Sequence, residues 1–552
     1  MSLKTQKGSE FCAANVKPMQ SNVFNKGTAF TAEEREKYHM RGLFPAAVET
    51  LEQQTARCYK QFQEMSTPLQ KFIYLNSLQE QNYTLFYSLV TSHIEEMIPI
   101  VYTPVVGEGC IKYSSIWRKP IGLFINANDK GHIREILDNW TNPVDIIVVS
   151  DGSRILGLGD LGTNGMGIPV GKLSLYVTAA LFHPECTLPV ILDVGCDRPE
   201  IRDADDYLGL KQGRIPDEEY YPFVDEFMAA VKDKWPHCLV QFEDFQKPRC
   251  FDLLDRFFTK QLCFNDDIQG TGAVICSGFI NAAKVSGIPL NEHRILFFGA
   301  GSASTGVGGM IANYIADQLK IDVAEARKQI RMIDSKGLVV KSRTVPPLPP
   351  HLLNWACDAE ACKDLVKIVA DFKPTALMGL SGQPKQFSKE VLEEMCKHCK
   401  RPIVFALSNP TSKSECSAEE AYTYTDGTCI FASGSPFDPV TYKGKTYTPG
   451  QGNNMYIFPG LGFGAWLAKS KLVTENMIMS TAITLAGCVT QEELDAGKIY
   501  PPVSKVQEIS RKVAANVIRT SIKDGMCQLE KIPEDIDAFV VENQWKVEYP
   551  KM

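Results

Sequence analysis

The chain has 552 residues, 44% of them hydrophobic and 22% charged, which is the composition of an ordinary globular protein. This length is too great for a single hydrophobic core and suggests about three or four structural units. The net charge of −7 argues against a nucleic-acid partner, which would favour a basic surface. No apolar run reaches the roughly 18 residues that a membrane-spanning helix needs, so we expect no membrane partner.

The N-terminal composition and the cysteines bear on location. Residues 1–31 contain lysines but neither arginine nor an apolar segment, so they match neither a secretory signal nor a typical transit peptide. We expect a cytoplasmic location, with a mitochondrial one as the alternative. The 17 cysteines are scattered without regular spacing, which favours reduced thiols. Cys396 and Cys399 have the spacing of half a zinc site, but the sequence has no second such pair, so we interpret them as a helical turn.

The first predicted elements are helices. From residue 32 to about residue 101, apolar residues recur near helical spacing, for example in Thr50–Glu64 and Pro68–Tyr87. We expect a helical N-terminal domain over residues 1–120. We interpret this domain as a scaffold that makes oligomer contacts.

Strand-like apolar runs follow the helical region. They alternate with helical segments, a pattern that favours a buried parallel sheet with catalytic residues at the carboxyl ends of its strands. We expect a central α/β domain for substrate and metal over residues 121–265 and 454–525. The strand-like runs are Gly122–Ile125, Val144–Ser150, Leu188–Val194 and Leu239–Phe242, and the helical segments between them include Lys172–Ala180 and Pro222–Lys234.

A second α/β unit begins near Asp266. Its first strand leads into a glycine-rich turn and a helix that extends to about Leu319, which is typical of a Rossmann-type domain. We assign residues 266–453 to this dinucleotide-binding domain and residues 526–552 to a C-terminal tail. The predicted fold class is therefore α/β, with a helical N-terminal domain, a central parallel-sheet domain and a Rossmann-type domain. The predicted strands of the second unit are Arg294–Phe298, Ile330–Asp334, Ala376–Met378, Ile403–Ala406 and Cys429–Ala432.

Two pairs of adjacent carboxylates stand in apolar sequence. Glu243 and Asp244 follow a predicted strand, and Asp266 and Asp267 precede a Gly-Thr step. Charged groups in apolar surroundings are costly unless they are compensated, and clustered carboxylate oxygens suit Mg²⁺ or Mn²⁺. The eight histidines show no zinc-like spacing, which also favours an oxygen-only metal site.

The glycine-rich turn has the form of a dinucleotide fingerprint. Gly299 and Gly301 would permit a tight turn and a close approach to a pyrophosphate, and the following helix would offer its N–H groups. A strand ending in Asp334 follows. An acidic residue there favours NAD, whereas Ser335 and Lys336, with the basic residues downstream, could hold a 2′-phosphate. We favour NADP, with NAD as the alternative. The residues of the turn are Gly299-Ala300-Gly301-Ser302-Ala303-Ser304.

Several further residues are ambiguous when they are considered alone. Lys172 stands at the end of a stretch with six glycines between positions 157 and 171, where it could be a desolvated base or a surface lysine. Tyr102 follows a helix and could be a general acid or a packed side chain. The amides Asn409, Asn453 and Asn454 lie in loops after strands and by themselves indicate only turns.

Together these segments resemble malic enzyme, in the order of the large-subunit form of that family. The resemblance extends from about Arg41 to Tyr549. It is carried by Tyr102-Thr103-Pro104, Arg154-Ile155-Leu156-Gly157-Leu158-Gly159-Asp160, Gly165-Met166-Gly167-Ile168-Pro169, Gln241-Phe242-Glu243-Asp244-Phe245, Phe264-Asn265-Asp266-Asp267-Ile268-Gln269-Gly270-Thr271, Phe405-Ala406-Leu407-Ser408-Asn409-Pro410-Thr411, Phe431-Ala432-Ser433-Gly434-Ser435-Pro436-Phe437 and Pro449–Asn454.

The resemblance implies an activity. The family converts L-malate to pyruvate and CO₂ and reduces NAD(P)⁺ with the help of Mg²⁺ or Mn²⁺. Its members form homodimers or homotetramers, so we expect a homo-oligomer. Some members are activated by fumarate through two arginines. Arg57 matches one of them, but Gln81 stands where the activated members have the other, so we expect weak or absent activation.

The resemblance also implies residue roles. Lys172 resembles the base that takes the proton of the C2 hydroxyl, Tyr102 the acid that protonates C3, and Asp266 the group that orients Lys172. Glu243, Asp244 and Asp267 resemble the metal ligands. Arg154, Asn409 and Asn454 would hold the substrate, and Asn409 and Asn453 would line the cofactor together with Gly299, Gly301, Ser302, Ala303, Ser304, Asp334, Ser335 and Lys336.

Two other classes of function compete with this interpretation. A metal-free amino-acid or 2-hydroxy-acid dehydrogenase on a related two-domain fold would need no pair of acidic motifs and would stay active in EDTA. A non-catalytic nucleotide-binding paralogue would be expected to lose Tyr102, Lys172 or a carboxylate, and the chain has all of them.

Overall fold

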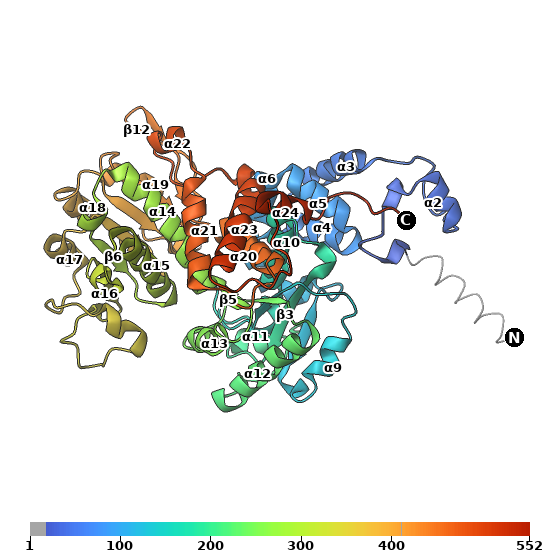
Figure 1. Cartoon of the computed structure of the whole chain (residues 1–552), viewed down its shortest axis with the longest axis horizontal. Helices are drawn as coiled ribbons and strands as arrows, with labels where there is room; N and C mark the ends of the chain where they lie inside the picture. The colour runs from blue at the N-terminus through green and yellow to red at the C-terminus, as the bar shows by residue number, and fades with distance from the viewer. Residues whose placement is uncertain (1–17, 410) are drawn as a thin grey trace. The chain divides into compact units, whose positions relative to one another are not determined.

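The computed structural model describes residues 18–409 and 411–552 of the chain. These residues form two compact units, whose helices and strands are labelled in Figure 1. Unit 1 contains residues 18–153, 160–236 and 543–552, and unit 2 contains residues 154–159 and 237–542. The four regions expected from the sequence stay a prediction. Among the described residues, no helix is both long enough and apolar enough to cross a membrane.

The N-terminal part of unit 1 is helical. Two of its helices, α3 (Leu51–Glu64) and α4 (Pro68–Gln81), begin at threonine capping boxes, in which a glutamine side chain returns a hydrogen bond to the threonine backbone. The helical stretch Pro68–Tyr87 is divided at Asn82, whose side chain accepts from the Leu85 N–H and caps α5 (Tyr83–Ser92). The other helices of this part are α2 (Ala32–Lys37), α6 (Ile94–Val101), α7 (Val105–Ile111) and α8 (Tyr113–Ile116).

Three parallel strands form the sheet of unit 1. They lie in the order β1 (Leu123–Asn126), β3 (Thr187–Asp193) and β2 (Ile146–Ser150), and every residue of β2 and β3 except Thr187 is buried. Helix α10 (Gly167–Ala180) packs on β2 and β3 and is itself almost wholly buried. The remaining helices of unit 1 are α9 (Ile133–Asp138), α11 (Pro199–Arg202) and α12 (Asp217–Lys234).

Unit 2 begins with two short parallel strands. β4 (Leu239–Phe242) coincides with the predicted run, whereas β5 (Cys263–Asn265) was not expected. Between them runs α13 (Arg249–Phe257). After β5 the chain makes a π-helical turn at Asp266–Gly270 and continues into α14 (Thr271–Ser286).

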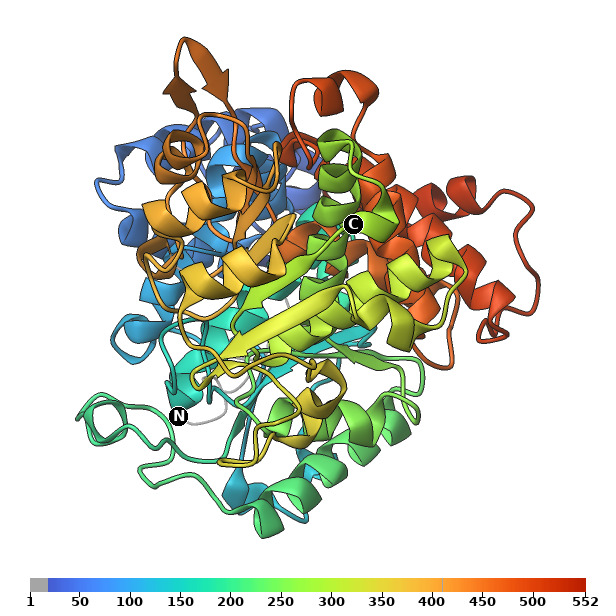
Figure 2. The same cartoon turned by 90° about the vertical axis from the view of Figure 1, so that its left-hand side faces the viewer.

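A seven-stranded sheet forms the dinucleotide-binding part of unit 2, with helices on either side of its strands (Figure 2). The strand order reverses beside β6, the point at which ligands bind in open α/β sheets. The strands described here pair in parallel, apart from β8, which is antiparallel to β7. In order across the sheet they are β14 (Gly450–Gln451), β11 (Ile430–Ser433), β10 (Ile403–Ala406), β9 (Ala376–Gly379), β6 (Ile295–Phe298), β7 (Ile330–Asp334) and β8 (Gly337–Leu338).

The helices of this sheet and of the C-terminal part complete unit 2. Helices α20 (Phe458–Leu467), α21 (Glu475–Gly487) and α23 (Val506–Lys523) pack against one another (Figure 1). A small hairpin, β12 (Val440–Tyr442) with β13 (Lys445–Tyr447), precedes them. The other helices are α15 (Ser302–Leu319), α16 (Val323–Arg327), α17 (Leu365–Phe372), α18 (Lys389–Cys396), α19 (Ala418–Tyr424), α22 (Gln491–Asp495) and α24 (Ile536–Glu542).

The last ten residues return to unit 1. The Trp545 N–H donates to the Leu181 carbonyl at 2.8 Å. The hydroxyl of Tyr549 donates to Gln54 at 2.6 Å and accepts from Asn82 at 2.9 Å. Residues 543–552 are therefore held by the helical N-terminal part of the chain.

Candidate active site

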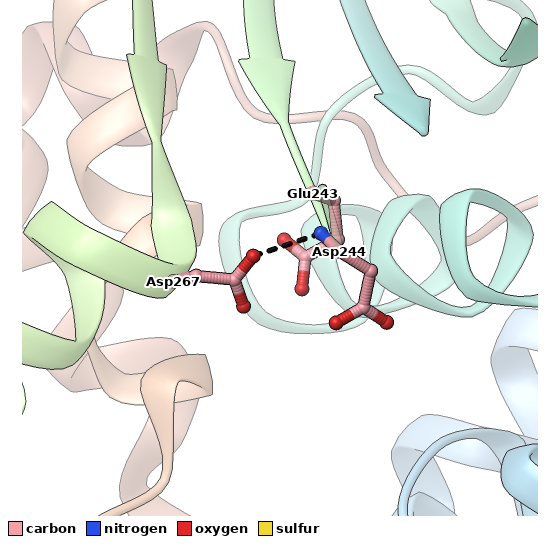
Figure 3. A group of neighbouring side chains, drawn as sticks. All are labelled: Glu243, Asp244 and Asp267. Carbon is pink, nitrogen blue, oxygen red and sulfur yellow. Dashed lines mark hydrogen bonds between the residues drawn. The ribbon is translucent and has the colours of Figure 1, made fainter. Parts of the chain in front are cut away.

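Three carboxylates converge at the ends of two neighbouring strands of unit 2 (Figure 3). Glu243 and Asp244 follow β4, and Asp267 follows β5 in the next strand position. One carboxylate oxygen from each lies within 4.8 Å of the others. Because β4 and β5 are parallel and adjacent, the residues after them come to the same edge. We call this group the carboxylate cluster.

Backbone and amide groups fix the cluster. The Asp244 N–H donates to a carboxylate oxygen of Asp267 at 2.8 Å, and the Gln241 side chain donates to Glu243 at 2.7 Å. Glu243 and Asp244 are buried, with 2% and 6% of their surface exposed. Three carboxylate oxygens in this arrangement, two of them from buried residues, fit a hard divalent cation such as Mg²⁺ or Mn²⁺.

The segment 154–159 lies against the cluster. The Arg154 N–H donates to the Asp244 carbonyl and the Leu156 N–H donates to the Asp244 carboxylate, each at 3.2 Å. Leu156 and Asp244 both adopt left-handed backbone, with φ of +48° and +58°. Strained backbone of this kind in non-glycine residues concentrates at functional sites. The residue expected to clamp the substrate, Arg154, is thus anchored beside a proposed metal ligand.

The π-helical turn gives the two adjacent aspartates different partners. Asp267 belongs to the cluster, whereas the fully buried Asp266 accepts from the Asn454 side chain at 2.9 Å. The Asp266 carboxylate lies so close to Gly270 that a Cβ there would be 1.9 Å from its oxygen. The role expected for Asp266, orienting Lys172, stays a prediction.

Lys172 and Tyr102 meet in unit 1. The Lys172 ammonium lies 5.1 Å from the centre of the Tyr102 ring, and only 2% of Lys172 is exposed. The surface-lysine alternative is therefore wrong. Our expectation that Lys172 opens the helix is also wrong, because α10 begins at Gly167. The lack of a side chain at Gly171 lets the Tyr102 ring pack closely against α10, since a Cβ at this residue would be 2.8 Å from a carbon of the ring.

The fingerprint turn lies between β6 and α15. Gly299 has a φ of +114°, and a Cβ there would be 2.7 Å from the Leu380 carbonyl oxygen, so the turn requires glycine. Gly301 precedes the first residue of α15, Ser302. Ser302 and Ser304 are buried, and the hydroxyl of Ser304 has no hydrogen-bond partner among the described residues. The first-turn N–H groups of this long helix suit a pyrophosphate.

Asp334, at the end of β7, is held by a cation. Arg343 forms an ion pair with its carboxylate and donates to the carbonyls of Gly337 and Leu338 at 3.0 and 2.7 Å. The Lys336 N–H also donates to Asp334, at 2.8 Å, while the side chains of Ser335 and Lys336 are exposed. The guanidinium of Arg343 offsets the negative charge of the Asp334 carboxylate, which would otherwise repel a 2′-phosphate.

The three loop amides lie in different surroundings. Asn454 donates to Asp266, as described above, and Asn453 caps the short helix Asn454–Tyr456 through the Met455 N–H. Asn409 follows β10 and accepts from the Ser435 hydroxyl at 2.6 Å. The structure therefore joins Asn454 to the acidic turn, and the roles of the other two stay predictions.

Sequence reasoning missed a buried charge network in unit 1. Arg214 donates to both carboxylate oxygens of Asp160, at 2.7 and 2.9 Å, and to the Asp151 carbonyl at 3.0 Å. The Asp151 carboxylate accepts from the Tyr220 hydroxyl at 2.9 Å. These contacts join Asp151 and Asp160 of unit 1 through one guanidinium. In the sequence, Asp160 was recognised only as the last residue of the motif that begins at Arg154, and no sequence pattern indicated that it pairs with Arg214.

Comparisons of sequence and fold relate the chain to known proteins. Residues 79–258 match the model of the malic enzyme N-terminal domain, and residues 268–522 match that of the malic enzyme NAD binding domain. An NADP-dependent malic enzyme of Dictyostelium discoideum is 52% identical, covering 96% of this chain and 97% of that protein. One of Vitis vinifera is 47% identical, covering 93% and 87%. The crystal structure of an Entamoeba histolytica malic enzyme, 20% identical, covers 92% of this chain and 90% of its own with a TM-score of 0.57.

Proposed function

The chain belongs to the malic enzyme family, and from this premise we propose that it catalyses the oxidative decarboxylation of L-malate to pyruvate and CO₂ with reduction of NADP⁺. One observation supports it most. Gly306 of α15 lies against the turn that carries Asp267, where a Cβ would be 2.6 Å from the Ile268 carbonyl oxygen. The helix of the dinucleotide turn and the carboxylate cluster are thus packed together within unit 2, as coupled redox and metal chemistry requires.

The chain's own residues take the following roles in this proposal. Lys172 accepts the proton of the C2 hydroxyl, and Tyr102 donates a proton to C3 after CO₂ has left. Arg154 binds a malate carboxylate, for which its planar guanidinium suits two parallel hydrogen bonds, and Asn409 and Asn454 hold other substrate oxygens. Asp266 orients Lys172. When bound, a Mg²⁺ or Mn²⁺ ion held by Glu243, Asp244 and Asp267 would polarise the C2 oxygen, and NADP⁺ would accept the C2 hydride.

NADP is the proposed cofactor, with NAD as the alternative. The names of the similar plant and Dictyostelium proteins state NADP dependence. The ion pair between Asp334 and Arg343 supports the same preference, because it leaves Ser335 and Lys336 beside a neutralised carboxylate. Asn453, Asn409 and the turn from Gly299 to Ser304 complete the cofactor contacts.

The remaining parts of the proposal concern assembly and location. We propose a homodimer or homotetramer whose contacts involve the helical N-terminal region, residues 1–120. We also propose a cytoplasmic location, with a mitochondrial one as the alternative.

An assay of the purified protein tests the proposal. Malate with Mn²⁺ should reduce NADP⁺ faster than NAD⁺, and EDTA should abolish the reaction. Formation of no reduced cofactor with either nucleotide would refute the proposal, and full activity in EDTA would favour the metal-free dehydrogenase.

The Lys172→Ala variant tests the proposed base. It should lower kcat by about 10³-fold, within the usual range for loss of a general acid or base. Binding of NADP⁺, followed by its effect on protein fluorescence, should stay unchanged. Malate oxidation at the wild-type rate would show that Lys172 is not the base.

A further inference from the structure

A lysine that belongs to neither the carboxylate cluster nor the fingerprint lies directly over the dinucleotide turn. Lys247 stands in the loop between β4 and α13. A Cβ built on Gly301 would be 2.1 Å from its ammonium nitrogen. Gly301 is the second glycine of the fingerprint, the position at which the backbone approaches a bound pyrophosphate. The ammonium therefore occupies the immediate surroundings of that group.

A guanidinium and an imidazole lie near the Lys247 ammonium. Partial burial, and next the like charge of Arg154, lower the pKa of Lys247. The pKa of His351 is lowered by burial and then by Lys247, and a hydrogen bond with the Ala300 backbone opposes this shift. The His351 ring stacks on Phe251 at 5.4 Å. Lys247 and Arg154 thus bring positive charge near the turn, and His351, whose lowered pKa keeps its ring neutral at pH 7, lies beside them.

The Lys247 side chain is available for a ligand. Within residues 18–409 and 411–552 its side chain forms no ion pair and no hydrogen bond, and part of it reaches solvent. A cation held against a backbone turn beside like charges is unfavourable unless an anion completes the site. The first turn of α15 offers backbone N–H groups to the same anion.

We propose that Lys247 binds the pyrophosphate of the dinucleotide, opposite the N–H groups of α15. This inference rests on the proposed NADP-dependent function. The 2′-phosphate of the same cofactor would lie elsewhere, near Asp334, Ser335 and Lys336 at the end of β7. Lys247 therefore acts on the part of the ligand that NADP⁺ and NAD⁺ share, and it should strengthen the binding of both.

Binding measurements with two probes separate these positions. NADP⁺ contains the pyrophosphate, whereas adenosine 2′-monophosphate lacks it and retains the 2′-phosphate. The Lys247→Gln variant should raise the Kd for NADP⁺ by about tenfold, the loss expected for a charge-assisted hydrogen bond. It should change the Kd for adenosine 2′-monophosphate by less than about twofold.

Three further variants complete the design. Lys247→Arg keeps the charge and should bind NADP⁺ nearly as the wild type does. Lys247→Met keeps the aliphatic stem and should match Lys247→Gln, and it replaces that variant should it fail to fold. Lys367→Gln removes an exposed charge from α17 of the same unit and should leave both Kd values unchanged.

Two results would overturn the inference. One is an NADP⁺ Kd within twofold of the wild type in Lys247→Gln and Lys247→Met. The other is an equal loss of adenosine 2′-monophosphate binding, which would indicate a general disturbance of the turn. The proposed function fails differently: a wild-type protein that binds NADP⁺ in a Lys247-dependent manner but does not oxidise malate would refute the activity and leave this inference standing.

Discussion

Each unit of the molecule buries a group of carboxylates, and the two groups are built in different ways. In unit 1, Arg214 lies between Asp160 and Asp151, with nitrogen–oxygen distances of 2.7 and 3.7 Å. In unit 2, oxygens of Glu243, Asp244 and Asp267 converge within 4.8 Å of one another. The first group has a cation supplied by the chain itself. The geometry of the second suits a cation from solution. Buried acidic residues are thus a sign of function only once their surroundings are known.

The largest expected effect tests the carboxylate cluster. Asp267→Asn should lower kcat/KM for malate by about 10³-fold, since loss of a metal-held charge removes several kcal/mol of transition-state stabilisation. Mn²⁺ should raise the melting temperature of the wild type and not that of the variant, because an ion that binds only the folded state stabilises it. Asp255→Asn, at an exposed position of α13, is the matched control. Equal Mn²⁺ stabilisation of both variants would contradict a metal site at the cluster.

The second prediction concerns the network in unit 1. Arg214→Met should lower the free energy of unfolding by about 3–5 kcal/mol, because it leaves buried carboxylates without their cation. The midpoint of urea denaturation measures the loss. Arg134→Met removes an arginine of the same unit whose side chain is 42% exposed, and the loss of its ion pairs should destabilise the protein much less. Similar losses of unfolding free energy in Arg214→Met and Arg134→Met would contradict a larger contribution from the buried network.

The third prediction compares how acid affects the stability that one group in each unit contributes. Burial lowers the pKa of His293, in unit 2, to about 4. The unfolded chain therefore binds a proton between about pH 6.5 and pH 4 that the folded protein does not, and stability falls as the pH falls through this window. From pH 7 to pH 5 the loss should be about 2 kcal/mol.

In unit 1, the contribution of Asp160 to stability is lost at a lower pH than that of His293. Burial would raise the pKa of Asp160, but the hydrogen bonds and charge of Arg214 outweigh it and the pKa is lowered. Its contribution to stability is complete above about pH 4 and is lost only below that value. The contributions of His293 and Asp160 are therefore lost in different pH windows. His293→Gln should flatten the dependence of stability on pH between 7 and 5, and an unchanged slope would contradict this assignment.

The smallest expected effect is a lack of response to fumarate. Arg57, in unit 1, is bound by Glu49 and Thr28, and the side chain of Gln81 donates to Ser77. A neutral amide at position 81 cannot replace a guanidinium toward a dicarboxylate. Fumarate should therefore change the KM for malate by less than about twofold in steady-state assays. A clear fumarate-dependent fall in KM would refute this expectation.

Sequence patterns predicted the longer buried elements well. The strands Leu239–Phe242, Ile330–Asp334 and Ile403–Ala406 have the predicted bounds, because continuous apolar runs are typical of buried parallel strands. The start of α10 was placed too late, since glycines normally disfavour helices. In the structure Gly167 and Gly171 are helical and allow Cys110 and Tyr102 to pack closely.

The candidate site was only partly predictable. Motifs identified Glu243, Asp244 and Asp267 as a group, and the structure brings them together. The three-residue strand β5 carries too little periodicity to be recognised alone. The contact of Lys247 with Gly301 joins positions more than fifty residues apart through tertiary structure, and neither residue signals the other. Long-range contacts of this kind are not encoded in local spacing.

The return of residues 543–552 to unit 1 has a consequence for biosynthesis. Tyr549 bonds to Gln54 and Asn82, which leave the ribosome several hundred codons earlier. During translation the contacts of Gln54 and Asn82 with Tyr549 can therefore form only after unit 2 has been made. Unit 1 therefore begins to be synthesised first and is completed last. A nascent chain that is interrupted before residue 543 carries an incomplete unit 1, which chaperones would be expected to bind.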